Sequence, residues 1–322
     1  MKRLECIVFD VEHGFSAFIK SPNDYGLLID CGRKAYFSPI KWTRSNYNPN
    51  NSNIQYFERR RIAKLVITHL HADHLRDVGH LIDTEKPKHL LRDQKTMKYV
   101  DQKIESKQND ESTKILRDFK VFQGKYTEDI EKDVEWGFDS FLSKNLSLED
   151  AKEVSSSEDN LINNRSFLTV VDYAGKKMLF PGDIEVKGWE KALTYKSIKE
   201  SLMGINFFIA SHHGHKSGFT SKIIEIAEKP DLFIVSAKSG DESIDSSYSK
   251  DEFCKGYLIK GDKEKTKMVS TRERNASIKI VIYENGSTEV SLLETKDNLN
   301  RDQRKILERR TNKILSDWKI KH

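Results

Sequence analysis

The chain has 322 residues, of which 37% are apolar and 33% charged, and its mean hydropathy is -0.66. It contains no apolar run near the roughly 18 residues that a membrane helix needs, and Glu5 and Asp10 interrupt any signal-peptide core. These features argue against membrane proteins and predict a cytoplasmic location without a membrane partner. Cys6, Cys31 and Cys254 are widely spaced and form no CxxC pair, which predicts reduced thiols.

The charge is concentrated at the C-terminus. The chain holds 55 basic and 50 acidic residues, and residues 301–322 hold eight basic and three acidic ones. This local excess equals the net charge of +5, so residues 1–300 are formally neutral. An apolar stripe with helical spacing predicts a basic amphipathic helix over 296–322: Ile306, Leu307, Ile314, Leu315 and Trp318. We favour docking of this helix on the body, with contact to nucleic acid or a protein partner as the alternative.

β-Branched and aromatic runs predict strands in chain order at 5–11, 16–20, 25–30, 62–69, 166–173, 176–183, 205–211, 232–237, 277–283 and 287–293. The run at 62–69 is nearly all apolar, so it is expected to be buried on both faces. Helices are expected from Asp73, near 185–198, and from about Ser217. The order predicts an α+β fold of two facing sheets with helices outside.

Two segments lack this rhythm. Residues 33–60 include the loop "SNYNPNNSN" flanked by Trp42, Tyr47 and a basic run, and residues 84–160 are charged and largely helical. We interpret both as insertions that frame a site within one domain spanning 1–295.

The stretch "THLHADH" places three histidines and an aspartate directly after an apolar run. His69 and His71 alternate in an extended segment, so both imidazoles can reach one ion. Asp73 and His74, at the turn into a helix, can face a second position close by. This spacing predicts two adjacent metal half-sites.

Two further polar groups follow later apolar runs. Asp183 ends "MLFPGD" on a tight turn and is the expected carboxylate between two ions. His212 and His213 end the strand before "GHKSG", and at least one is expected to complete the second metal position. His215 is expected to face solvent or substrate.

The motifs "THLHADH", "FPGD" and "FDVEHG" with "LLIDCG" resemble those of the metallo-β-lactamase-fold hydrolases, in the family's order over residues 5–295. Together with "NNRSFLTV" and "SHHG", they look most like the hydrolase domain of ComEC-type DNA-uptake proteins. The resemblance implies a four-layer αβ/βα sandwich and a metal-dependent nuclease or phosphodiesterase. It implies metal ligation by His69, His71, Asp73, His74, Asp183 and His212 or His213, with catalytic roles for Asp73, Asp183, His212 and His213.

The chain departs from this family in three places. Between the main motifs only His80 and His89 could supply the usual third histidine of the first metal, and neither ends a predicted strand. Asn163, Asn164 or water is the expected replacement. No histidine follows the strand at 232–237, and Glu12 stands where relatives have glycine. One metal position is therefore expected to be weakly occupied.

The expected cofactors are two divalent ions, with zinc favoured over manganese by the imidazole-rich ligands. Such a pair activates water and stabilises both oxygens of an in-line displacement, which suits phosphodiester cleavage of nucleic acid or nucleotides. Candidate phosphate contacts are His13, Lys216, Ser217 and Arg272. The alternatives are hydrolysis of a small ester, lactone or amide, and a non-catalytic subunit of a larger complex.

Overall fold

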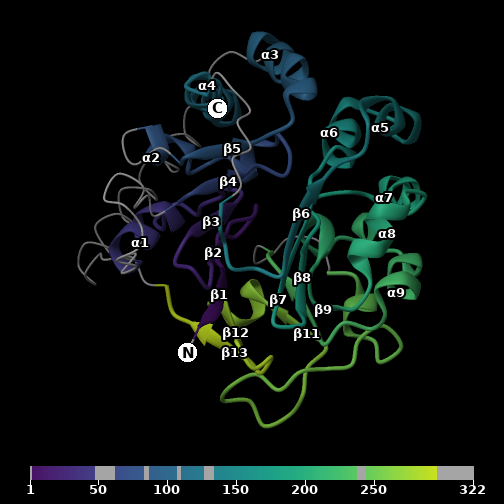
Figure 1. Ribbon diagram of the computed structural model, residues 1–322. Helices are drawn as coiled ribbons and strands as arrows, with labels where there is room; N and C mark the ends of the chain where they lie inside the picture. Colours follow the sequence, from purple (N-terminus) through teal and green to yellow (C-terminus); the bar gives the residue numbers. More distant parts are fainter. Residues whose placement is uncertain are drawn as a thin grey trace, which may run out of the picture.

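Two β-sheets lie face to face in the computed structural model, and helices cover the outer face of each (Figure 1). The structure describes residues 2–47, 62–82, 87–106, 110–126, 134–237 and 244–295. The predicted α+β class and the arrangement of helix, sheet, sheet and helix layers are confirmed. The predicted C-terminal helix at 296–322 lies outside the described residues.

The first sheet carries the N-terminal strands. Its order is β13 (Thr288–Leu293), β12 (Ser277–Tyr283), β1 (Arg3–Val8), β2 (Ala17–Lys20), β3 (Gly26–Ile29), β4 (Lys64–Val66) and β5 (His89–Leu91). The pairs β3–β4 and β4–β5 are parallel and the others antiparallel. The loop after β4 therefore leaves the sheet beside the loop after β3.

The second sheet carries the later strands. Its order is β11 (Met268–Ser270), β10 (Leu232–Val235), β9 (Ile205–Ile209), β8 (Lys176–Phe180), β7 (Leu168–Tyr173) and β6 (Ser140–Lys144). β8 and β9 are parallel, as are β9 and β10. Because parallel strands end at the same sheet edge, the loops after β8 and β9 emerge together.

The helices form two outer layers, α1–α4 on the first sheet and α5–α9 on the second (Figure 1). Their bounds are α1 (Pro39–Asn46), α2 (Val78–Ile82), α3 (Met97–Ser106), α4 (Glu111–Gln123), α5 (Leu148–Val154), α6 (Glu158–Asn164), α7 (Val186–Ala192), α8 (Lys196–Leu202), α9 (Ser221–Ala227) and α10 (Thr271–Arg274), with 3-10 turns η2 (Ala72–His74), η3 (Gln94–Thr96), η4 (Ser211–Gly214), η5 (Lys216–Gly218) and η6 (Ser246–Ser249). None of the helices in these ranges has the length and apolarity needed to cross a membrane.

The period of two residues along a strand divides its side chains between two apolar clusters. In β1, Leu4, Cys6 and Val8 join the core between the sheets, whereas Ile7 packs under the outer helices. In β8, Met178 and Phe180 face the central core and Leu179 faces the opposite layer. The buried parts of these inner strands are mostly apolar in sequence because both of their faces are covered. All three cysteines are buried with free thiols.

The described residues of 84–160 are largely helical, as predicted, but they also include two strands that the sequence pattern missed. β5 extends the first sheet by parallel pairing with β4, and β6 pairs with β7 at the edge of the second. Both are edge strands with mixed polarity, so they lack the apolar signal of inner strands.

The aromatic residues before the Asn-rich loop also have a packing role. In α1 the Trp42 ring lies 5.5 Å from that of Phe9, and Tyr47 lies 4.9 Å from Phe18. Both rings therefore pack in the apolar layer under α1, where Tyr47 is buried and Trp42 is partly buried. Residues 48–60 of this segment lie outside the described residues.

Candidate metal centre

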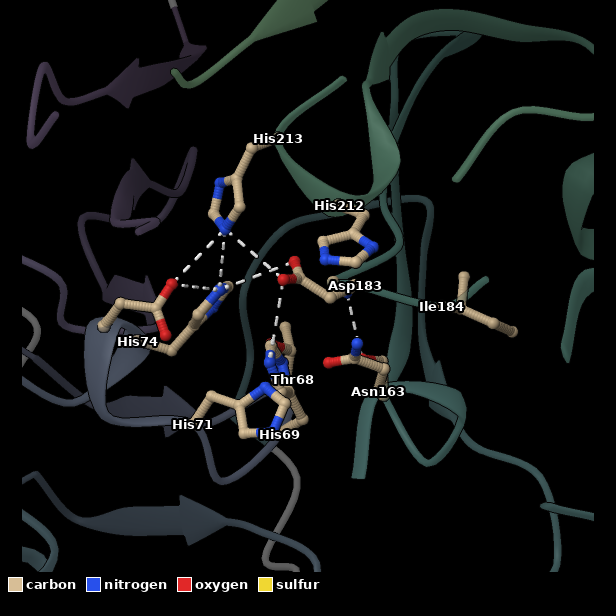
Figure 2. Close-up of polar contacts among 12 residues, drawn as sticks. Thr68, His69, His71, His74, Asn163, Asp183, Ile184, His212 and His213 are labelled. Atoms are coloured by element: carbon tan, nitrogen blue, oxygen red, sulfur yellow. Dashed lines mark hydrogen bonds and ion pairs between the residues drawn. The ribbon is translucent and has the colours of Figure 1, made fainter. Parts of the chain in front are cut away.

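Three loops from both sheets meet at one place. His69, His71 and η2 follow β4, Asp183 follows β8, and His212 and His213 follow β9 in η4. A backbone hydrogen bond from His212 N–H to the Gly182 carbonyl (3.2 Å) joins the last two loops, and Phe167 N–H, just before β7, donates to the Thr68 carbonyl (2.9 Å) in the first. Figure 2 shows the imidazoles of His69, His74 and His213 arranged around Asp183.

Four side chains converge most closely. Nε2 of His213 lies 3.3 Å from Asp183 Oδ2, 3.4 Å from Asp73 Oδ2 and 3.3 Å from His74 Nε2. His74 Nε2 lies 3.4 Å from Asp183 Oδ1 and 3.5 Å from Asp73 Oδ2. A tetrahedral ion with bonds of about 2.0–2.1 Å separates its ligand atoms by about 3.3–3.4 Å. These spacings are suitable for a divalent cation. Among the described residues, the groups of three whose ligand atoms all lie within 4.8 Å of one another are His69, His74 and Asp183, and His13, Asp73 and His213.

A second position lies on the other side of Asp183. His69 Nε2 is 3.8 Å from Asp183 Oδ2, and the rings of His69 and His71 are 4.8 Å apart. Nε2 of both rings and Oδ1 of Asn163 are buried without a hydrogen-bond partner among the described residues. Unpaired buried acceptors are costly, so a cation bound by His69 Nε2 would be favourable, while His71 Nε2 lies 3.6 Å from Asp159 Oδ1. His69, His71 and Asp183 are thus available to a second ion.

Asp30 supports the centre from below and was not among the sequence-predicted site residues. Its fully buried carboxylate accepts hydrogen bonds from Thr68 N–H and Thr68 Oγ1, both at 2.7 Å, and lies 2.7 Å from His74 Nδ1. A carboxylate on one ring nitrogen orients the other nitrogen toward a metal. The signal was the acidic end of "LLIDCG", which could also have been an ordinary strand-end turn.

The charges in the cluster compensate one another. Burial alone would raise the pKa of Asp183, but the imidazoles of His213 and His74 hold it well below its usual value. Burial alone would lower the pKa of His213, yet the carboxylates of Asp183 and Asp73 raise it to about 10. Without metal, protonated rings balance the carboxylates. A divalent cation would take over this role and release protons on binding.

His212 and His213, which were predicted as a pair, make different contacts. Both residues have left-handed backbones, with φ of 51° and 56°, and His213 Nε2 lies 3.4 Å from Asp73 Oδ2 and 3.3 Å from Asp183 Oδ2. His212 Nδ1 lies 2.9 Å from Ser217 Oγ, which is also 2.8 Å from His215 Nδ1. The Ser217 hydroxyl therefore contacts the rings of His212 and His215 and does not face the metal ligands.

The remaining predicted residues lie at varied places. His13 Nε2 is 3.6 Å from Asp73 Oδ2, whereas Lys216 and Arg272 do not line the cavity above the centre. His80 Nδ1 lies 2.7 Å from Asp77 Oδ1, away from the cluster. His89 is in β5. Neither of the last two replaces the missing third histidine.

A cavity of about 450 Å³ opens over the centre. Its walls combine the metal-centre loops with α3, α4 and α6, and its lining residues are His13, Leu70, His71, Ala72, Asp73, Arg76, Lys103, Ser112, Thr113, Leu116, Asp159, Asn163, Asp183, His212 and His213. Asn163 lines the cavity, whereas Asn164 Oδ1 accepts a hydrogen bond from Glu185 N–H at 3.0 Å. Arg76 and Lys103 were not predicted as site residues.

Gly14 should be essential for the position of Asp73. Its φ is +113°, and a Cβ there would lie 2.3 Å from the Asp73 carbonyl oxygen. Gly14→Ala should lower the free energy of unfolding by about 1–3 kcal/mol and reduce bound metal, measured by urea unfolding and elemental analysis. Gly175→Ala is the matched control, since Gly175 has φ of +71° and no atom within 4 Å of its Cβ position. Equal losses in both variants would contradict this role of Gly14.

Two facing sheets with a His- and Asp-rich centre at their edges are the architecture of a metal-dependent hydrolase. The family model of the metallo-beta-lactamase superfamily matches residues 10–237, and this chain belongs to that superfamily. A similar solved structure is the 1.98 Å crystal structure of Zn²⁺-bound PqqB from Methylobacterium extorquens, with 12% identity, a TM-score of 0.40, and coverage of 73% of this chain and 89% of that chain. No curated protein matches the sequence.

Proposed function

We propose that this chain is a metal-dependent phosphodiesterase that cleaves nucleotide-sized phosphodiesters or the ends of single-stranded nucleic acid. The observation that carries the proposal is the pairing of a His/Asp metal centre with the cations Arg76 and Lys103 in one cavity. Together they suit a substrate that is negatively charged at its reacting group. The sequence resemblance to ComEC-type hydrolase domains supports the same chemistry.

Each group has a role in this proposal. Asp73, His74, Asp183 and His213 would hold one ion, and His69, His71 and Asp183 the other, with zinc favoured over manganese. When bound, the ions lower the pKa of water to roughly 7 and stabilise charge on the phosphoryl oxygens.

The side chains around the ions position the substrate. Ser217 fixes Nδ1 of His212 at 2.9 Å, which leaves Nε2 for a phosphoryl oxygen. His13 lines the cavity with half of its side chain exposed and Nε2 3.6 Å from Asp73. It is placed to give a proton to the leaving oxygen.

The cavity size favours a second candidate, hydrolysis of a small ester, lactone or amide. A volume of about 450 Å³ lies within the roughly 300–1,000 Å³ range of small-molecule sites. Residues of α3 and α4 form part of the cavity wall. A hydroxide activated by a metal pair can attack either a carbonyl or a phosphoryl centre. The charge of the preferred substrate therefore distinguishes the two candidate functions.

A substrate panel tests the proposal. Metal-loaded protein would be incubated with bis(4-nitrophenyl) phosphate, a dinucleotide, single-stranded DNA, duplex DNA, RNA, 4-nitrophenyl acetate and a lactone. We expect cleavage of the dinucleotide and of single-stranded ends, with duplex cleaved more slowly. Turnover of the acetate or lactone without phosphodiester cleavage would favour the second candidate. Inactivity on every substrate with the metals bound would favour a non-catalytic subunit.

A further inference from the structure

Arg76 places a cation in a cavity that also contains carboxylates. It lines the cavity, and its Nε is buried with no hydrogen-bond partner among the described residues. A buried guanidinium nitrogen without an acceptor is unfavourable unless a ligand supplies one. The arginine therefore has binding capacity that the rest of the protein does not use.

The backbone around Arg76 is anchored on both sides. Leu75 N–H donates to the Ala72 carbonyl at 3.1 Å, and Asp77 N–H donates to the Cys31 carbonyl at 2.7 Å. The fully buried Asp77 carboxylate also accepts from Ser38 Oγ at 2.7 Å and Ile40 N–H at 3.0 Å. Arg76 thus projects from a fixed segment directly after the metal ligands, which limits the freedom lost on binding.

The charges in the cavity also leave Arg76 available. Metal ions would neutralise Asp73 and Asp183, and Lys103 Nζ donates to Asp159 Oδ1 at 2.6 Å. Once these carboxylates are compensated, Arg76 adds a positive charge that none of them neutralises, with Ser112 in the same cavity wall. A planar guanidinium matches the oxygens of phosphate in a bidentate arrangement.

We propose that Arg76, with Ser112 in the same cavity wall, forms a subsite for a second phosphate of the substrate, apart from the phosphate at the metal centre. This inference rests on the proposed phosphodiesterase function and specifies its substrate class: a nucleotide or oligonucleotide end that carries a terminal phosphate. The metal centre acts on one phosphoryl group while Arg76 holds the other.

Binding of two non-cleavable ligands tests the subsite apart from catalysis. The dissociation constants of thymidine 3′,5′-bisphosphate and thymidine 5′-monophosphate would be measured by calorimetry on the full metal-loaded chain. We expect the wild type to bind the bisphosphate about tenfold or more tightly than the monophosphate, as charge-assisted bidentate bonds allow. Arg76→Gln should bring this ratio close to one with metal content unchanged.

Arg117→Gln is the matched control, because Arg117 is exposed on α4 and does not line the cavity. It should keep the wild-type ratio. A wild type without preference for the bisphosphate, or an Arg76→Gln variant that keeps the preference, would overturn the subsite. One further outcome separates the two proposals. If the wild type cleaves no phosphodiester but prefers the bisphosphate, and Arg76→Gln abolishes that preference, the proposed function fails and the subsite stands.

Discussion

Asp183→Asn should abolish hydrolysis and disturb both metal positions. The two carboxylate oxygens face His74 at 3.4 Å, His213 at 3.3 Å and His69 at 3.8 Å. An amide keeps one oxygen acceptor and loses the negative charge. We expect bound metal to fall from two equivalents to one or fewer, and turnover to fall on the order of a thousandfold or more because activation of water depends on the ions.

Elemental analysis and initial rates on bis(4-nitrophenyl) phosphate measure this effect. Asp251→Asn makes the same chemical change at an exposed carboxylate that pairs only with Lys267 at the surface, at 2.7 Å. Such surface pairs contribute little to stability, so this control should keep both metal and activity. An Asp183→Asn enzyme with two equivalents of metal and wild-type turnover would show that Asp183 does not join the two positions.

Asp30→Ala should weaken both the fold and the metal centre. The change leaves Thr68 N–H, Thr68 Oγ1 and His74 Nδ1 without their shared buried acceptor. Unsatisfied buried groups cost about 1–3 kcal/mol each, so we expect the free energy of unfolding to fall by about 3 kcal/mol or more. Loss of the carboxylate that orients His74 should lower metal affinity about 10–100-fold.

Two measurements separate these effects. Urea unfolding of the metal-free protein gives the change in stability, and competition with a chelator gives the zinc affinity. Asp30→Asn keeps the size of the side chain and one acceptor oxygen. Its stability and its zinc affinity should therefore lie between those of the wild type and those of Asp30→Ala. Wild-type zinc affinity in a folded Asp30→Ala protein would exclude a role of Asp30 in orienting His74.

The inner strands could be predicted from the sequence because their pattern is local. The second halves of β1 and β8 are apolar and buried on both faces, since one face packs in the central core and the other under helices. The edge strands could not be predicted from such a local pattern. β5 is only three residues long, and β6 carries Ser140, Ser143 and Lys144, so each becomes a strand through its pairing partner.

The candidate site also contains residues that could be predicted from the sequence and residues that could not. His69, His71, Asp73 and His74 could be placed together because they follow one strand within six residues. The role of Asp30 could not be predicted, because it depends on the parallel pairing of Ile29 with Val66, which sets Asp30 beside Thr68.

The choice between His212 and His213 also lies beyond sequence patterns. It follows from left-handed backbone angles at both residues, which side-chain type alone does not indicate. The exposure of Arg76 to the cavity depends in turn on α3 and α4, which are distant in sequence from the metal motif.

We predict that the chain binds two metal ions, one on each side of Asp183. The most direct measurement is an anomalous difference map from crystals of the protein grown with zinc, collected above and below the zinc absorption edge. We predict two peaks, one within bonding distance of Asp73, His74 and His213 and one beside His69 and His71, with unequal heights if one position is weakly occupied. A map with no peak near these residues, from protein that retains its fold, would contradict the account.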